Sequence, residues 1–243
     1  DTMRRQAEGF GAEFCLATVT GLEADGDIRT VHTDKGDFTC FGILIATGAH
    51  PRRIGFPGED DFRGRGVAYC ATCDGAFFRG MRVAVVGGGD TAFEDALYLA
   101  DLAAEVYLVH RREQFRAQQY LVDRAAHTEN IHFVKNAVPV EIGGGMDLSF
   151  LRLQNTATGA EETLEVEGVF VAIGYQPNTA LVAGQVTLDS AGYVAAGEDT
   201  KTNLQGVFAA GDLRQKPLRQ VVTAAADGAV AAMQAHVACM HQE

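Results

Sequence analysis

Two cysteines, Cys70 and Cys73, are the residues whose types and spacing most clearly suggest chemistry. They enclose two residues in the pattern C-x-x-C, and thiols at this spacing can close a disulfide at a turn or a helix start. A helix amino terminus would also lower the pKa of a thiol and favour the reactive thiolate. Asp74 follows directly and is a candidate proton donor and acceptor. The segment therefore favours thiol–disulfide redox chemistry, with Cys70, Cys73 and Asp74 as candidate catalytic residues.

Two other interpretations of this cysteine pair stay open, half of a zinc site and a purely structural pair. A zinc site would need a second C-x-x-C or a nearby pair of histidines, so we expect no metal. The strand–helix–strand pattern beside the pair makes redox activity the better hypothesis. Cys15, Cys40 and Cys239 lie singly in apolar stretches, and we expect small buried side chains there rather than a disulfide framework.

A glycine-rich turn of the pattern G-x-G-x-x-A lies between an apolar strand pattern at 82–86 and a helical pattern at 90–104. The first glycine permits a tight turn, the second lets the backbone approach a pyrophosphate, and the small third residue permits close helix–strand packing. Free N–H groups at the start of the helix can bind the phosphates. This context favours a dinucleotide site over a plain turn. The candidate cofactor-binding residues are Gly87, Gly88, Gly89, Asp90 and Thr91.

The next strand pattern, residues 105–109, ends in a basic cluster within an otherwise acidic chain. An NAD site usually has an acid there, about 20 residues after the glycines, to bind the ribose hydroxyls. Guanidinium groups suit a 2′-phosphate instead, because they are planar, permanently charged and able to bond bidentately. The cluster therefore predicts NADP(H), the alternative being an exposed loop with surface ion pairs. Its candidate residues are His110, Arg111, Arg112 and Arg116.

A buried strand pattern at 206–210 ends in Gly-Asp and precedes a helical pattern from Arg219 to about Cys239. One apolar stripe of this helix can be formed by Val221, Val222, Ala225, Ala229, Ala232 and Met233. An acid at that strand end can accept a hydrogen bond from a ribityl hydroxyl, and the helix points its first N–H groups into the same cleft. A simple Gly-Asp turn is the other interpretation. The candidate residues of this segment are Gly211, Asp212, Arg219, Gln220 and Val221.

The elements that position these residues predict two interleaved α/β units. Residues 43–46 form a short apolar run that fits a buried strand feeding the turn Thr47-Gly48. Turn-rich boundaries predict that residues 53–176 are inserted between residues 1–52 and 177–243. The remaining expected elements are a helix at 2–10, an antiparallel meander at 13–19, 28–33 and 37–40, a helix at 118–126, and strands at 131–134, 138–142, 148–155, 162–166 and 169–172.

The composition is that of a globular protein, with 47% hydrophobic and 21% charged residues among 243. The net charge of −12 argues against binding to nucleic acid. We expect no apolar run to approach the roughly 20 residues that a membrane helix needs. The first residues are polar and unlike a signal peptide, which predicts a cytoplasmic location.

Five segments, taken in order, resemble low-molecular-weight thioredoxin reductase, a class of the pyridine nucleotide-disulfide oxidoreductases. CATCDG together with HRRxxFR is quite specific, and the resemblance spans essentially the whole chain. The segments are CATCDG at 70–75, GGGDTA at 87–92, HRREQFR at 110–116, FVAIGYQPN at 170–178 and GVFAAGD at 206–212, with Arg219-Gln220 after them.

The resemblance implies a homodimeric flavoprotein with two Rossmann-like, three-layer domains and a redox-active disulfide bond. Residues 1–52 and 177–243 would form the FAD domain, and residues 53–176 the NADPH domain. Electrons would pass from NADPH through FAD to the disulfide and on to thioredoxin, with a rotation between the domains. Cys73 resembles the flavin-facing thiol, Cys70 the thiol that attacks thioredoxin, and Asp74 the proton donor.

The resemblance also assigns the cofactor contacts. Arg111, Arg112 and Arg116 resemble the contacts to the NADPH phosphate. The FAD contacts would be Thr47, Gly48, Asp212, Arg219, Gln220 and Val221. Asp90 stands where the family usually has Asn, and Leu218 where many members carry Tyr.

The family begins with a strand, a G-x-G-x-x-G/A turn and a helix that hold the FAD pyrophosphate. Nothing before Cys15 matches these, so we expect about eighty residues of a first dinucleotide unit to be missing and the FAD domain to be incomplete. Two alternatives to a thioredoxin reductase stay open. One is a reductase of another disulfide partner, such as a peroxiredoxin-linked one, and the other is a flavin-free, NADP(H)-binding fragment without catalysis.

Overall fold

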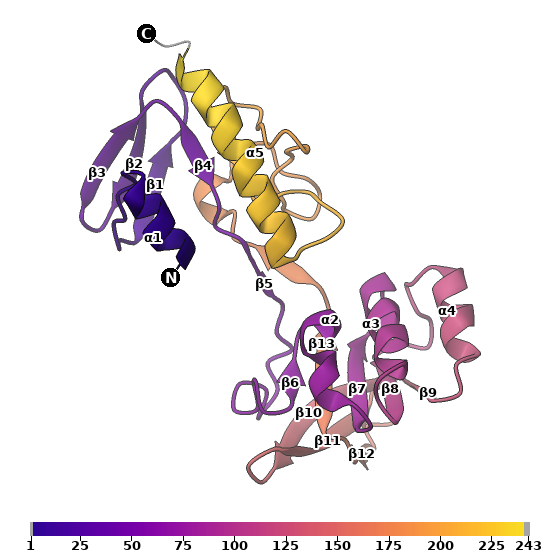
Figure 1. Ribbon diagram of the computed structural model, residues 1–243. Coiled ribbons are helices and arrows are strands. Elements are labelled where there is room, and N and C mark those ends of the chain that lie inside the picture. Colours follow the sequence, from indigo (N-terminus) through magenta and orange to yellow (C-terminus); the bar gives the residue numbers. More distant parts are fainter. Residues whose placement is uncertain (1, 241–243) are drawn as a thin grey trace. The chain divides into compact units, whose positions relative to one another are not determined.

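The computed structural model describes residues 2–240, which form two compact units (Figure 1). Unit 1 comprises the chain up to His50 and from Gln176 onward, and unit 2 comprises Pro51–Tyr175. These bounds lie within two residues of the expected ones, 52 against 50 and 177 against 176. The chain therefore passes from unit 1 into unit 2 and back again.

Unit 2 is built on a five-stranded sheet in which every paired strand is parallel to its neighbour. Its strands are apolar along nearly their whole length, as is usual when both faces of a sheet are covered. In spatial order they are β6 (Val67–Ala68), β13 (Gly168–Ala172), β7 (Arg82–Gly87), β8 (Glu105–His110) and β9 (Ile131–Lys135).

The two faces of this sheet are covered by different layers (Figure 1). Alternate side chains of a strand point to opposite faces, so Val83 and Val85 pack among the helices while Ala84 and Val86 pack against a second sheet. The helical layer contains α2 (Ala71–Asp74), η1 (Gly75–Phe78), α3 (Asp90–Ala100) and α4 (Gln119–Ala126). The second sheet is antiparallel and contains β10 (Ala137–Gly144), β11 (Leu148–Asn155) and β12 (Glu161–Leu164).

Unit 1 has a parallel strand pair at its centre, β4 (Ile43–Ile45) with β15 (Val207–Ala209). Phe208 of β15 packs with Ala231 of the long helix α5 (Val221–Met240), and Val207 packs in a cluster on the other side of the pair. The other elements of unit 1 are α1 (Thr2–Gly9), the antiparallel strands β1 (Val19–Glu23), β2 (Arg29–Thr33) and β3 (Gly36–Cys40), and η2 (Ala180–Val182). The paired strands β5 (Ala49–Pro51) and β14 (Tyr175–Pro177) each include residues of both units.

Several expectations about local structure were wrong. The first meander strand is β1 rather than residues 13–19, because pairing of Leu22 with Val31 sets the register. Helix α3 ends at Ala100, not at 104, because the next residues turn back into the sheet. Cys15 and Cys239 are exposed and Cys40 is half-buried, so the expectation of three buried cysteines fails.

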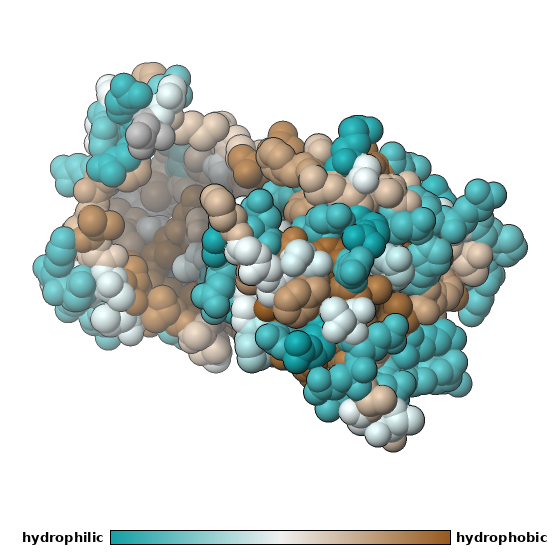
Figure 2. Space-filling view, turned by 90° about the horizontal axis from the view of Figure 1, so that it is seen from below, coloured by the Kyte–Doolittle hydropathy of each residue, from teal (hydrophilic) through white to brown (hydrophobic). Residues whose placement is uncertain are grey.

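Helix α5 also differs from its expected orientation. Its buried residues are Asp227 and Ala231, because this narrow face is the one that meets the β4–β15 pair. The expected apolar stripe is exposed; it consists of Val221, Val222, Ala225, Ala229, Ala232 and Met233. Hydrophilic residues otherwise cover much of the molecular face drawn in Figure 2, with hydrophobic patches between them.

The expectation about membrane helices was wrong as well. Within residues 2–240, α5 is the one helix long and apolar enough to cross a membrane by length and composition alone. Core helices of soluble proteins pass the same test, so a single such helix is weak evidence for a membrane.

Phe93 of α3 is fully buried and meets Phe115 and Phe133 edge to face. Phe93→Ala should lower the free energy of unfolding of unit 2 by about 3–5 kcal/mol, because it removes a buried ring and leaves a cavity. Phe77→Ala is the matched control, since that ring is 77% exposed and its loss should change stability by less than about 0.5 kcal/mol. Urea unfolding followed by circular dichroism measures both, and equal losses would contradict the assigned core.

Candidate functional site

Three chemistry-bearing segments of unit 2 follow parallel strands of one sheet. The cysteine pair follows β6, the glycine turn follows β7, and the basic cluster follows β8. Because the carboxyl ends of parallel strands share one edge, all three segments leave the sheet at that edge. Ligand sites of open α/β sheets lie in this position.

Cys70 and Cys73 form a disulfide with an S–S distance of 2.05 Å and a Cα–Cα distance of 5.3 Å. Cys70 is the N-cap of α2, with extended backbone, and its Sγ accepts a hydrogen bond from the backbone N–H of Cys73 at 3.2 Å. Such a donor stabilises negative charge on sulfur once the disulfide is reduced. The disulfide is accessible, since Cys70 is half-buried and Cys73 is exposed.

A hollow of about 440 Å³ opens beside the disulfide, entirely within unit 2. Cys70 and Asp74 both line it, and so does Phe77, whose ring is exposed. The other lining residues are Pro51, Arg63, Gly64, Gly66, Val67, Ala68, Tyr69, Phe78 and Tyr175. The arrangement places a sulfur and a carboxyl group on a surface that another molecule can reach.

A buried carboxylate fixes the backbone just before Cys70. Glu59 is 2% exposed and accepts hydrogen bonds from the Tyr69 hydroxyl at 2.8 Å and from the N–H groups of Ile54 and Gly55 at 3.3 and 2.6 Å. The hydroxyl of Tyr175 donates to the Tyr69 carbonyl at 2.9 Å. Burial, together with the hydrogen bond to Glu59, raises the pKa of Tyr69 to about 12.

In the glycine turn, packing against neighbouring residues explains why two of the three motif positions are glycine. A Cβ on Gly87 would lie 2.4 Å from the Ala172 carbonyl oxygen and 2.6 Å from the Ala92 Cβ, so this position must be glycine for strand and helix to pack. A Cβ on Gly88 would lie 2.2 Å from the His110 ring. Gly89, the N-cap of α3, has open space where a side chain would lie.

The His110 ring packs against the glycine turn at Gly88. The ring is buried, faces Phe115 at 5.3 Å between centroids, and shares a hydrogen bond of 3.1 Å with the Gln114 carbonyl. Burial lowers the pKa of His110, which favours the neutral ring. The backbone N–H of Arg116 donates to the Gly88 carbonyl at 2.7 Å. The basic loop is thereby held against the glycine turn.

The arginines of this loop are open to a ligand. Arg111, Arg112 and Arg116 are exposed, and within residues 2–240 their guanidinium groups form no ion pair. The neighbouring acid Glu113 bonds instead to Lys135 at 3.0 Å and Asn136 at 2.8 Å, and these bonds lower its pKa.

Asp90 and Thr91 lie at the start of α3, beside Gly89. The Asp90 carboxylate accepts hydrogen bonds from the backbone and side-chain N–H groups of Gln118, at 2.7 and 2.9 Å. These bonds lower the pKa of Asp90. Asp90 thereby fixes the start of α4 and the end of the basic loop, a role that the sequence did not indicate. A cofactor contact by Asp90 or Thr91 stays a prediction.

In unit 1, two candidate segments follow the parallel pair β4–β15. Thr47 and Gly48 follow β4, and Gly211 and Asp212 follow β15, so both leave the same edge of the pair. Asn178 locks the first turn, since it accepts from the Thr47 hydroxyl at 2.7 Å and donates to the Thr47 carbonyl at 2.8 Å.

Asp212 holds a polar atom that lacks a partner. Its Oδ1 is buried and, within residues 2–240, has no hydrogen-bond partner. Buried acceptors are nearly always satisfied, so this oxygen fits a ligand hydroxyl. Arg219 lies close by, with its Nε 3.4 Å from the Asp212 carbonyl and its guanidinium 3.9 Å from the Tyr193 ring centre. Gln220 and exposed Val221 lead into α5, as expected.

Sequence reasoning missed the polar groups that hold these segments in place. They are Glu59, Tyr69, Asn178, Arg214, Lys216 and Asp227. One signal was available: Asp227 is the only Asp, Glu, Lys or Arg in helix α5. A lone carboxylate on such a helix indicates a partner elsewhere in the fold.

Comparisons with known proteins agree on one family. Residues 5–228 match the family described as pyridine nucleotide-disulphide oxidoreductase. Thioredoxin reductase of Peptoclostridium acidaminophilum is 44% identical over 241 residues, which cover 97% of this chain and 76% of that relative. The bifunctional thioredoxin reductase/thioredoxin of Mycobacterium leprae is 46% identical over 237 residues, covering 97% and 52%. The crystal structure of thioredoxin reductase from Streptococcus pyogenes is 39% identical with a TM-score of 0.90, covering 99% of this chain and 79% of that one.

Tyr69 should ionise at pH of about 12, because burial and the Glu59 carboxylate favour its neutral form. The folded chain keeps this proton to a higher pH than the unfolded chain, whose phenol releases it near pH 10. The contribution of Tyr69 to stability is therefore complete below pH 10 and declines as the pH rises toward 12. The absorbance difference between wild type and Tyr69→Phe isolates this titration, and Glu59→Gln should lower its midpoint. A midpoint near 10 in wild type would contradict the Glu59 contact.

Proposed function

Because this chain belongs to the thioredoxin reductases, a family of pyridine nucleotide-disulphide oxidoreductases, we propose that its Cys70–Cys73 disulfide takes electrons from NADPH by way of FAD and passes them to thioredoxin. The observation that carries this proposal is the accessible disulfide at the end of β6, beside a hollow that also exposes Asp74. The bifunctional mycobacterial relative, whose name includes thioredoxin, supports thioredoxin as the partner rather than another disulfide protein.

FAD would be held at the strand ends of unit 1. The unpartnered Asp212 oxygen would accept a ribityl hydroxyl, and Thr47, Gly48 and Gly211 would bring backbone close to the ligand. Val221 would offer its N–H group at the start of α5, with Arg219 and Gln220 beside it. When bound, FAD supplies a two-electron relay between a nicotinamide and a disulfide.

NADPH would bind at the strand ends of β7 and β8 in unit 2. Gly89 presents the start of α3 to the pyrophosphate, and no side chain fills the space beside it. The exposed guanidinium groups of Arg111, Arg112 and Arg116 would bind the 2′-phosphate, since Glu113 is paired elsewhere. The domain assignment follows: residues 53–176 bind NADPH, and residues 1–52 with 177–243 bind FAD.

The cysteines would then exchange disulfides with thioredoxin. Two electrons break the Cys70–Cys73 bond and leave two reduced sulfurs. The Cys70 thiolate, stabilised by the Cys73 N–H, attacks one sulfur of the thioredoxin disulfide and releases the other, to which Asp74 can supply a proton. Cys73 next attacks Cys70 in the mixed disulfide, which re-forms the Cys70–Cys73 bond and frees reduced thioredoxin. The family likeness also supports a homodimer and a cytoplasmic location.

With excess FAD, the purified chain should keep a visible flavin band after free flavin is removed, and NADPH should bleach that band. Cys70→Ser should keep the bleaching but lower NADPH-dependent thioredoxin reduction at least about a thousandfold, because the nucleophile is lost. Cys15→Ser, at an exposed cysteine outside the site, is the control and should keep full activity.

Unchanged thioredoxin reduction in Cys70→Ser would contradict the assignment of Cys70 as the nucleophile. A chain that binds NADPH without retaining flavin would instead support the flavin-free alternative. Faster reduction of another thioredoxin-fold protein, such as one linked to a peroxiredoxin, would transfer the proposal to that partner.

Arg111→Ala and Arg112→Ala should each raise the KM for NADPH about 10- to 100-fold, because each removes a charged hydrogen bond to the 2′-phosphate. The KM for NADH should not change, since NADH lacks that phosphate. Arg124→Ala, an exposed arginine on α4, is the matched control and should change neither value. Steady-state kinetics with both coenzymes measures these KM values. An equal rise in the KM for NADH would contradict a contact between the arginine and the 2′-phosphate.

A further inference from the structure

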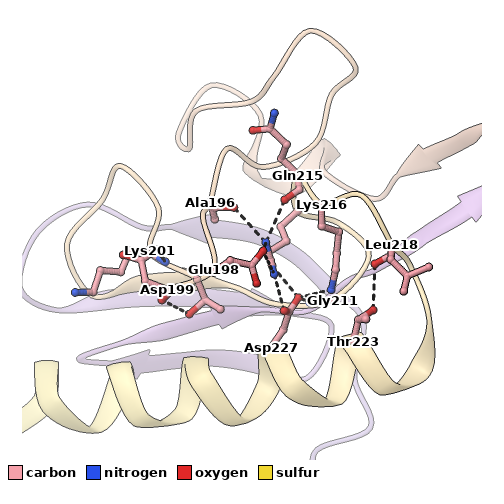
Figure 3. A network of polar contacts seen from close by, with 12 residues as sticks. Ala196, Glu198, Asp199, Lys201, Gly211, Gln215, Lys216, Leu218, Thr223 and Asp227 are labelled. Carbon is pink, nitrogen blue, oxygen red and sulfur yellow. Dashed lines mark hydrogen bonds and ion pairs between the residues drawn. The ribbon is translucent and has the colours of Figure 1, made fainter. Parts of the chain in front are cut away.

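The buried carboxylate of Asp227 on α5 forms hydrogen bonds with the loop that follows β15 (Figure 3). The Asp227 carboxylate accepts hydrogen bonds from the Gly211 N–H at 2.8 Å, from Arg214 at 2.8 and 2.6 Å, and from Lys216 Nζ at 2.8 Å. All four donors belong to one short loop, and all meet one side chain of the helix. The loop and the helix therefore cannot shift relative to one another without breaking charged hydrogen bonds.

The charges in this network are hidden from water to an unusual degree. Asp227 is 5% exposed and Arg214 is 1% exposed. Glu198, whose side chain is exposed, adds a second carboxylate 3.3 Å from Arg214. Burial alone would raise the pKa of Asp227, but hydrogen bonds from Arg214, Lys216 and Gly211 hold it far below its usual range. Asp227 therefore stays ionised, with its charge compensated.

Packing alone would not require such a network. Buried ion pairs often stabilise a fold no better than apolar side chains of similar volume, because both charges must leave water. What the charged pair supplies is a fixed geometry, since hydrogen bonds are directional and apolar contacts are not. The geometry fixed here is that of Gly211, which has a φ of +81° and directly precedes Asp212.

Gly211 and Asp212 are thus held from the helix side. The Gly211 N–H donates a hydrogen bond to Asp227, and the Ala210 N–H donates to the Ile45 carbonyl of β4 at 2.9 Å. The turn is fixed at both residues that lead into Asp212, and the Asp212 Oδ1 is left buried without a partner within residues 2–240. A pre-set acceptor of this kind binds a hydroxyl without first having to reorganise.

We propose that Asp227 is a positioning residue for FAD, which acts by holding the Gly211-Asp212 turn so that the free Asp212 oxygen meets a ligand hydroxyl. Asp227 itself touches no cofactor in this arrangement; it acts through Asp212, with Arg214 and Lys216 keeping it ionised and in place. This inference rests on the proposed function, since it requires FAD to bind at Asp212.

The test is a double-mutant cycle on the full chain with Asp227→Asn and Asp212→Asn, read as the dissociation constant for FAD in a titration of flavin-free protein. Each single variant should weaken FAD binding about tenfold, the low end of what outer-shell partners contribute at metal sites. The double variant should bind FAD no more weakly than Asp212→Asn alone, because both act through one contact. Asp199→Asn, an exposed acid of the same unit, is the control and should bind like wild type.

Thermal unfolding of each flavin-free variant confirms that it is folded at the titration temperature. If Asp227→Asn does not fold, Lys216→Met replaces it in the cycle. In Lys216→Met the bond between Asp227 and Arg214 remains, so FAD binding should weaken only about threefold, and the effect should again not add to that of Asp212→Asn. The positioning role of Asp227, but not the FAD site, would be overturned if the two effects multiplied in the double variant or if folded Asp227→Asn bound FAD like wild type. No FAD binding by wild type, or unchanged affinity in Asp212→Asn, would overturn the proposed FAD site as well.

Discussion

Parallel pairing of strands is the constraint on which the rest of this structure depends. A parallel strand must return to its starting edge through a crossover, so successive strands end at the same edge and their following loops meet there. In unit 2 this rule brings together the segments after β6, β7 and β8, which carry a disulfide, a glycine turn and a basic loop. In unit 1 it does the same for the segments after β4 and β15. Residues far apart in sequence thereby share one edge of a sheet.

The sequence predicted best where one element carries its own signal. The pattern of β7, α3 and β8 was correct in type and order because an apolar strand, a glycine turn and a periodic helix are each local features. The cysteine pair was equally visible, since its spacing alone allows ring closure. The family resemblance added FAD and the partner, whereas the glycine turn and the basic cluster had predicted NADP(H) from the residues themselves.

Several failures concern contacts between elements. The outward stripe of α5 is more apolar than its buried face, and only the position of β15 decides that Asp227 faces inward. The exposure of Cys239 follows from that same orientation. Glu59 and Tyr69, and Asp90 and Gln118, are pairs separated by 10 and 28 residues, beyond the reach of any helical or strand period. Long-range polar pairs of this type need the fold before they can be seen.

The contact between Gly88 and His110 has a consequence for how such a chain can change over generations. The His110 ring occupies the space that a Cβ on Gly88 would need, so Gly88 cannot gain a side chain unless the side chain at position 110 becomes smaller. The guanidinium groups a few residues away are under no such packing restraint, because Arg111 and Arg112 are exposed. If Arg111 and Arg112 bind the 2′-phosphate as proposed, single substitutions there can change the preference between coenzymes, whereas Gly88 stays restrained by packing.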